Sequence, residues 1–106
     1  MYFTITSVRL KGPFSFFKLA GISSKVARQL KGSEGFVQHK STGMWTEHYT
    51  MSLWKTEKDL MKSHLEAIRC YREVADEIKT LTLAADKFPD WQIAKDMLSR
   101  NGKVID

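Results

Sequence analysis

The sequence has little cysteine and few residues that break regular structure: it contains one cysteine, two prolines and six glycines in 106 residues. Cys70 alone cannot form an intramolecular disulfide bond or a CxxC motif. No apolar run approaches the roughly 20 residues that cross a bilayer, and the first residues lack the basic segment and apolar core of a secretory signal. We therefore expect a cytoplasmic protein with no membrane partner.

Several motifs of catalysis and metal binding are also missing. The three histidines show neither HxxxH nor HxH spacing, and no acidic residues group around them, so no metal site is expected. A GxSxG nucleophile motif and a phosphate-binding glycine loop are absent. These absences argue against a hydrolase and against a nucleotide-binding enzyme.

Negative charge is missing from the first third of the chain, where no Asp or Glu precedes Glu34 although the formal net charge is +5. Such an asymmetry can attract an anionic ligand or nucleic acid. The basic residues are scattered rather than clustered, which is typical of a solvated surface. RNA-recognition domains also need a run of exposed aromatics on their third strand, and residues 47–54 (EHYTMSLW) lack it. Nucleic acid is therefore not an expected partner.

The pattern of segments predicts an α+β protein with a single domain over residues 1–106. Strands are expected at residues 2–10, 36–42, 45–54 and 80–86. Helices are expected at residues 23–31, in a long stripe from Leu60 to Ile78 that begins after the N-cap Thr56, and from Pro89 to Asn101. This order is that of the ferredoxin-like βαββαβ fold with an added C-terminal helix.

Three local features complete the expected architecture. Residues 13–22 form an aromatic, loosely helical stretch that Gly21 breaks, and Gly32 ends the helix that follows. In the third strand, residues 49, 51 and 53 share one face, and His48, Thr50, Ser52 and Trp54 share the other. Because two helices cover only one face of such a sheet, we expect a second copy of the chain to cover the other face.

One segment resembles a known family. Residues 50–60 (TMSLWKTEKDL) resemble the strand-to-helix junction, T-x-S-x-W-x-s-x-x-x-(L/M), of the dimeric α+β barrel superfamily. Within it, the chain is most similar to the uncharacterised spheroidene-monooxygenase-like and antibiotic biosynthesis monooxygenase-like proteins. The resemblance implies a homodimer. It also implies either cofactor-free oxygenation of a polycyclic aromatic or heme as a cofactor, but the first strand lacks the asparagine of heme-degrading members.

His64 is the strongest candidate for a catalytic residue. It lies in the middle of the apolar stripe of the long helix, where an imidazole needs a partner or a function. A neutral ring there can act as a general base or ligate heme iron, whereas a structural histidine would donate to a backbone carbonyl, Ser52 or Tyr71. Tyr71 can likewise hydrogen-bond a substrate oxygen or form the rim of the core.

The candidate substrate-binding residues are His48, Ser52, Trp54 and Phe17. The first three share a polar and aromatic strand face, which meets His64 if it looks toward the helices. If that face looks toward a partner, His48 is an interface residue, and we favour this second arrangement. Phe17 can roof a cavity for a flat hydrophobic ligand, although core packing explains such aromatics equally well. His39, near a sheet edge, is expected to be exposed.

Two functions remain open from the sequence. The first is a small homodimeric monooxygenase-like or heme-binding protein that holds a hydrophobic aromatic ligand between sheet and helices. The second is a non-catalytic ligand-binding or stress-related dimer with the same cavity. Cofactor-free oxygenation needs few catalytic residues, so the missing motifs do not decide between the two.

Overall fold

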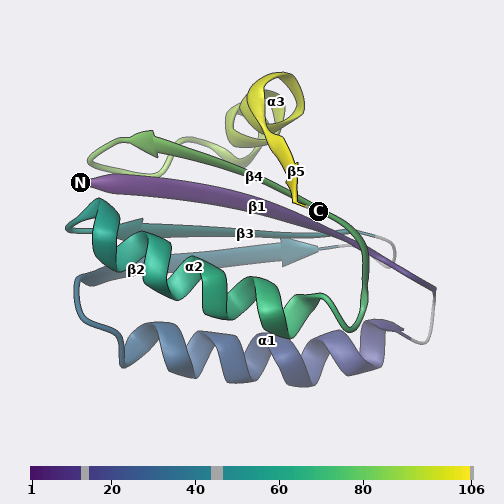
Figure 1. The fold of residues 1–106 in the computed structure, drawn as a ribbon. Coiled ribbons are helices and arrows are strands. Elements are labelled where there is room, and N and C mark those ends of the chain that lie inside the picture. The colour runs from purple at the N-terminus through teal and green to yellow at the C-terminus, as the bar shows by residue number, and fades with distance from the viewer. Residues whose placement is uncertain (13–14, 44–46, 106) are drawn as a thin grey trace.

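The computed structural model describes residues 1–12, 15–43 and 47–105, without the side chains of residues 15 and 16. The order of its elements confirms the ferredoxin-like α+β unit with a C-terminal helix and adds a short last strand (Figure 1). None of the described helices is long and apolar enough to cross a membrane. The strands are β1 (Tyr2–Leu10), β2 (Phe36–Gly43), β3 (Glu47–Trp54), β4 (Ala75–Ala84) and β5 (Lys103–Ile105), and the helices are α1 (Ser15–Lys31), α2 (Glu57–Tyr71) and α3 (Trp91–Asn101).

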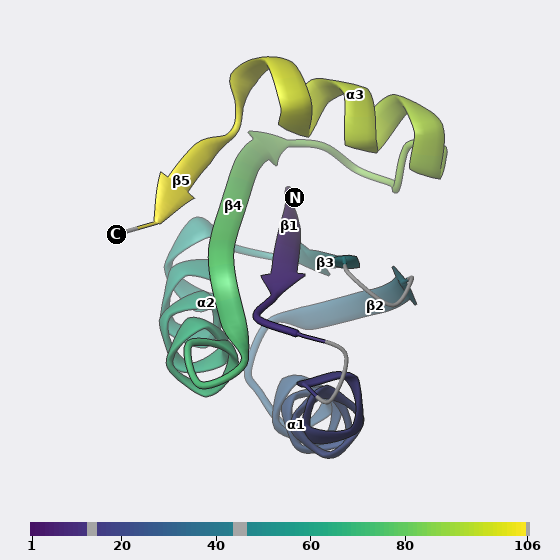
Figure 2. The same cartoon turned by 90° about the vertical axis from the view of Figure 1, so that its right-hand side faces the viewer.

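The strands form one five-stranded antiparallel sheet in the order β2-β3-β1-β4-β5. β1 lies at its centre, hydrogen-bonded to β3 on one side and to β4 on the other. Helices α1 and α2 lie side by side on one face, and α3 lies on the opposite face (Figure 2). β1 is therefore covered on both faces, which explains why its apolar residues do not fall on one side only.

The core beneath α1 and α2 combines β1 residues with the apolar stripes of both helices. Val8 is fully buried and Leu10 is nearly so. They pack with the helix residues and with the strand ends that face them, in a cluster that includes Leu19, Val26, Leu30, Trp54, Leu60, Ile68, Tyr71, Val74 and Ile78. This core positions the candidate site, because the cavity described below lies within it.

A second core lies on the other face, under α3. Phe3 and Ile5 pack there with residues of β3 and α3, namely Met51, Leu53, Ala94 and Leu98. Phe88 also meets Phe3 edge-on, with ring centroids 6.0 Å apart. The premise that this face stays open for a second copy is wrong, because α3 of the same chain buries it. The sequence analysis predicted α3 but did not place it on this face.

The start of α2 is fixed by Thr56, as predicted. Its Oγ1 accepts a hydrogen bond from the Asp59 N–H at 3.2 Å and donates to Asp59 Oδ2 at 2.8 Å. Gly35 lies against the same carboxylate with φ 78°, and a Cβ there would come within 2.3 Å of Asp59 Oδ2. Only glycine therefore lets the loop before β2 approach α2 this closely.

Helix α1 begins earlier than predicted, although it ends at Lys31 as expected. It begins at residue 15 and continues through Gly21, because Gly21 faces open space and Leu19 contributes a buried side chain before it. Gly32 directly follows the last helical residue, as predicted, but without a positive φ, which among the described glycines only Gly35 has. Residues 13, 14 and 44–46, which belong to predicted segments, lie outside the described residues.

The boundary between α2 and β4 is also earlier than predicted. The helix ends at Tyr71 and β4 begins at Ala75, so Val74 and Ile78 do not continue the helical stripe. Val74 and Ile78 are four residues apart, a spacing that places two residues on one face of a helix and also on one face of a strand. The sequence pattern therefore did not distinguish the end of the helix from the start of the strand. The Lys11 N–H donates to the Val74 carbonyl at 3.0 Å and aligns this segment with β1.

Trp54 is buried, with 1% of its surface exposed. Its indole packs edge-on against Phe36 with centroids 5.6 Å apart, and its Nε1 donates to Ser52 Oγ at 2.9 Å. We expect Trp54→Ala to lower the free energy of unfolding by about 3–5 kcal/mol, measured by urea denaturation. Trp54→Phe, which keeps a ring but loses the N–H donor, should cost less. An alanine variant that unfolds at the wild-type urea concentration would contradict this role.

Candidate functional site

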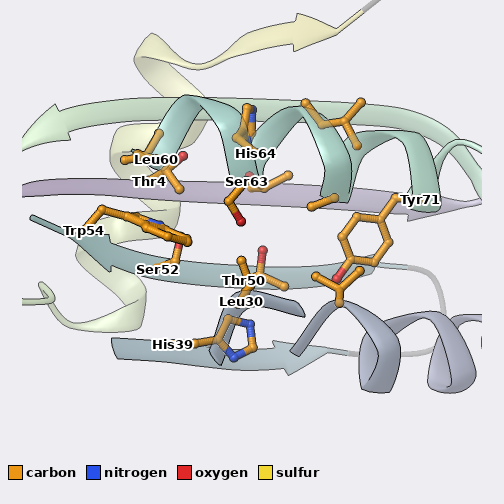
Figure 3. A pocket seen from close by; sticks show the side chains of 14 residues that line it. Thr4, Leu30, His39, Thr50, Ser52, Trp54, Leu60, Ser63, His64 and Tyr71 are labelled. Atoms are coloured by element: carbon orange, nitrogen blue, oxygen red, sulfur yellow. The ribbon is translucent and has the colours of Figure 1, made fainter. Parts of the chain in front are cut away.

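A small cavity lies between the sheet and helices α1 and α2 (Figure 3). Its volume is about 30 Å³, which is room for about two water molecules. Trp54 and Tyr71 lie at its opposite ends in the view of Figure 3. The sheet contributes Thr4, Thr6, His39, Thr50, Ser52 and Trp54, α1 contributes Val26 and Leu30, and α2 contributes the other lining residues.

The floor of the cavity comes from a hydroxyl–apolar–hydroxyl triplet in β1 and β3, and the neighbouring strand β4 carries a matching triplet that does not line the cavity. The triplets are residues 4–6 (TIT), 50–52 (TMS) and 80–82 (TLT). The register aligns them, because Thr4 pairs with Ser52 and Thr82, and Thr6 pairs with Thr50 and Thr80. Alternation turns the hydroxyl residues toward α1 and α2 and the apolar ones toward α3. Since serine and threonine are short, they leave space beneath the helices.

Several of these hydroxyls are held by hydrogen bonds. Thr4 Oγ1 donates to the Leu81 carbonyl at 3.1 Å. The hydroxyls of Thr6 and Thr80 lie 3.3 Å apart, and Ser52 Oγ accepts from the Trp54 indole. The floor is therefore polar but fixed, and it can offer a ligand the hydroxyl groups that these bonds leave unused.

His64 lines the cavity from α2 and is partly buried. Burial lowers the pKa of its imidazole below the usual 6.5, so the ring is neutral at pH 7. Within the described part of the chain, no hydrogen bond joins either ring nitrogen to another residue, and the expected structural partners Ser52 and Tyr71 do not bond to it. The ring can therefore accept a proton or a hydrogen bond from a ligand.

Ser63, beside His64 on α2, is a lining residue that the sequence analysis missed. Only 4% of its surface is exposed, and its buried Oγ has no hydrogen-bond partner among the described residues. In Figure 3 the Ser63 and His64 side chains leave the helix in different directions, and the Ser63 oxygen points over Thr50. A buried hydroxyl without a partner costs stability, so this group is a candidate for ligand contact.

Tyr71 closes the far end of the cavity and is 3% exposed. Burial raises the pKa of its phenol, and the nearby Ser23 hydroxyl opposes that shift. Ser23 Oγ nevertheless lies outside hydrogen-bonding geometry and is itself buried without a partner in the described structure. The phenol therefore stays protonated at neutral pH and can donate a hydrogen bond into the cavity.

The other two histidines do not lie where they were expected. His39 is half-buried and lines the cavity, so its predicted exposure is wrong; β2 turns it to the helix side, opposite Ser52. The face with His48 also looks toward the helices, so the preferred arrangement, in which it meets a partner, is wrong. His48 itself does not line the cavity, and its buried Nε2 has no partner among the described residues.

The structure thus brings four of the six candidate residues together around the cavity: Ser52, Trp54, His64 and Tyr71. His48 lies beyond the lining, and Phe17 is 69% exposed on α1 and does not line it either. His39 is paired with Ser52 in the register of β2 and β3, and this pairing, which places it on the helix side, is known only from the folded sheet. Nothing in the sequence marks Ser63 as lacking a partner.

Neither heme nor any other drug-sized ligand fits this cavity unless its walls move. Pockets for drug-sized ligands are about 300–1,000 Å³, an order of magnitude more than the about 30 Å³ between these side chains. His64 is an available nitrogen ligand, but the Trp54 and Leu60 side chains are tightly packed around the space that a porphyrin would need. Among the described residues, no group of His, Cys, Asp or Glu side chains is placed to hold a metal ion.

Comparison by sequence gives no match to a family model or to a curated protein. Comparison of structures does. SnoaB from Streptomyces nogalater, a cofactor-independent oxygenase, superposes with a TM-score of 0.66 at 12% identity, covering 84% of this chain and 96% of SnoaB. A proposed antibiotic biosynthesis monooxygenase from Nitrosomonas europaea gives 0.66 at 16% identity, covering 82% of this chain and 100% of the other. A conserved protein from Methanosarcina mazei Go1 gives 0.68 at 13% identity, covering 80% and 92%.

The fold is that of the antibiotic biosynthesis monooxygenase-like proteins. The resemblance first noticed at residues 50–60 is thereby confirmed at the level of fold. At these identities the likeness carries no activity with it. The function of the chain must be argued from its own cavity.

The buried histidines make stability depend on pH. Burial is the main cause that lowers the pKa of His39, His48 and His64, with Lys31 adding to the shift at His39 and His39 adding to that at His48. The unfolded chain therefore binds protons near pH 6.5 that the folded protein does not, so stability is complete above pH 6.5 and falls as the pH drops through the folded values.

We expect the free energy of unfolding in urea to fall between about pH 7.5 and 5, and His64→Gln to make that fall smaller. NMR titration of the imidazole resonances reads each pKa separately. A His64 pKa at or above 6.5 would contradict the burial of its ring.

Proposed function

We propose that this chain is a small cofactor-independent oxygenase that holds a flat aromatic ligand between the sheet and helices α1 and α2. The proposal is supported by the fold shared with a cofactor-independent oxygenase. It rests on one observation above all: the neutral imidazole of His64 has no partner in a cavity whose walls are largely apolar. Such a ring can serve as a general base.

The reaction class follows from what the cavity offers. His64 takes a proton from an acidic C–H of the ligand, and the carbanion passes one electron to dioxygen. The resulting radical and superoxide combine at that carbon, and the proton returns to give a hydroperoxide. Loss of water leaves a ketone, so the overall change is R₂CH₂ + O₂ → R₂C=O + H₂O. Apolar walls favour this sequence because they exclude water from the reactive anion.

Tyr71 has a supporting role in this scheme. Because burial raises the pKa of its phenol, the group stays protonated and can donate a hydrogen bond to the developing oxyanion. The hydroxyl floor, with Thr50 and Ser52, can orient an oxygen of the ligand from below. Trp54 then forms a flat apolar end wall against which an aromatic ring can pack.

The ligand must widen the cavity as it binds. Helix α1 is the wall that we expect to move, since side-chain packing and one partly buried hydrogen bond from Gln29 Nε2 to Glu66 Oε2, rather than a strand ladder, join it to α2. Displacing Val26 and Leu30 opens space above Thr50 without disturbing the sheet. Ligand binding is therefore expected to be slower than diffusion, because the helix must move first.

A direct test uses anthrone, a flat tricyclic compound with an acidic CH₂ group that oxidation converts to anthraquinone. We expect His64→Ala to fold normally by circular dichroism and to lose about 10²-fold or more in kcat, in keeping with the loss of a general base. His48→Gln is the matched control, because it removes a histidine that does not line the cavity. Wild-type turnover should fall as the pH drops through the lowered His64 pKa.

Two outcomes would redirect the proposal. Anthrone binding, seen by tryptophan quenching, without turnover above the uncatalysed rate would favour the non-catalytic ligand-binding protein. A hemin titration that gives a stoichiometric Soret shift in wild type but not in His64→Ala would show that the cavity opens far enough for heme, and would replace oxygenation with heme binding.

We also propose that the chain forms a homodimer. The support is the resemblance to a dimeric superfamily together with exposed apolar side chains on β4, α3 and β5, namely Leu83, Ile93 and Val104. Since α3 covers much of this sheet face, we expect the partner to pack across the outer surface of α3 and the exposed residues of β4 and β5 beside it.

Light scattering should therefore give twice the chain mass of 12.2 kDa. Ile93→Lys should shift the protein toward monomer, because it places a charge in an apolar contact. Val37→Lys, an exposed site on β2, is the control and should leave the mass unchanged. A wild-type mass of 12.2 kDa at micromolar concentrations would exclude the dimer.

A further inference from the structure

A second, larger cleft meets the cavity at Ser63. It lies at the surface between the end of α1 and the first turns of α2, and its volume is about 270 Å³. Ser63 lines both spaces. Its Oγ is buried and has no partner among the described residues, so an unused hydroxyl lies at the junction of the two.

The cleft is acidic although the chain is basic. Its charged lining residues are Glu34, Asp59 and Glu66 against the single amine of Lys62. The whole chain carries a formal net charge of +5. The local charge therefore opposes the overall charge, and the cleft attracts a cation that the rest of the surface repels.

The walls of the cleft are held in place from both sides. Asp59 is fixed by Thr56 and by close approach to Gly35, and the Lys55 N–H donates to the Gly35 carbonyl at 2.9 Å. Glu66 accepts from Gln29 across the gap between the helices. A carboxylate oxygen has more than one acceptor position, so both groups can still bind a further donor.

Building on the proposed function, we infer that the ligand carries a protonated amine substituent, which the acidic cleft binds while the aromatic part occupies the cavity. Ser63 hydrogen-bonds the linker at the junction. This arrangement explains why a buried hydroxyl is kept without a partner in the free protein. It also names the ligand class: an aromatic compound with a cationic side chain one short linker away from the rings.

Three fluorescent probes of equal length separate the charge of the substituent from the aromatic part. They are 2-(1-naphthyloxy)ethylamine, which is cationic, 2-(1-naphthyloxy)ethanol, which is neutral, and (1-naphthyloxy)acetate, which is anionic. We expect the amine to bind about tenfold more tightly than the acetate, with the alcohol between them, and this preference to shrink in high salt.

Glu34→Gln combined with Glu66→Gln should reduce the preference to about twofold, because it removes two carboxylates while an amide can still accept from Gln29. Glu73→Gln combined with Asp76→Asn removes the same charge at exposed sites outside the cleft and should keep the preference. Equal loss in both double variants, or no preference in wild type, would overturn the inference. Failure of the neutral probe to bind would instead refute the aromatic cavity of the proposed function.

Ser63→Ala tests the junction separately. Removing a buried hydroxyl without a partner should leave the melting temperature of the free protein unchanged or raise it, yet weaken the amine and alcohol probes by about threefold to tenfold. Ser24→Ala, at an exposed position on α1, is the control and should change neither. Unchanged probe affinities in Ser63→Ala would remove Ser63 from the ligand site.

Discussion

Strand alternation in β1 is the constraint on which the rest of the structure depends. As the central strand it is covered on both faces, so each residue from Phe3 to Val8 must pack beneath one helix layer or the other. Phe3 and Ile5 fill the space between the sheet and α3. Thr4 and Thr6 face α1 and α2, and the space between these helices and the sheet is left partly empty. The cavity therefore exists because short hydroxyl side chains stand where the opposite face has large apolar ones.

The strand register brings the short hydroxyl side chains of β1 and β3 next to one another on the same face of the sheet. Had the triplet of β3 been displaced by one residue, apolar side chains would have filled the cavity and hydroxyls would have been buried under α3. The helix above contributes groups that can meet a ligand, since the buried Ser63 hydroxyl has no hydrogen-bond partner within the described residues and His64 lines the cavity beside it. The cavity therefore combines a polar floor, held by hydrogen bonds, with a buried hydroxyl on α2 that a ligand could hydrogen-bond.

Much of this architecture could be predicted from the sequence, and the exceptions have physical causes. The βαββαβ order and the Thr56 cap follow from local patterns and were confirmed. The end of α2 was missed because Val74 and Ile78 suit both a helix and a strand. α3 packs on strands that are distant in the sequence. The local periodicity of a C-terminal helix does not indicate which face of the sheet it covers, so this contact could not be predicted.

The site was predictable only in part for a similar reason. His64 and Tyr71 lie on the apolar stripe of α2, which fixes their direction, and alternation in β3 places Ser52 and Trp54 opposite them. The exposure of Phe17 could not be foreseen, because the course of α1 through Gly21 sets it. The lack of a partner for Ser63 depends on every neighbouring atom, and therefore on the folded structure alone.

The two cores of this small protein share a sheet but divide its side chains cleanly between them. α3 and its contacts with Phe3 and Ile5 lie on the side away from the cavity. Substitutions in the core under α3 can therefore change the thermal stability of the protein without altering any residue that lines the cavity. Conversely, the hydroxyl floor can be altered to suit a new compound while α3 continues to hold the sheet together.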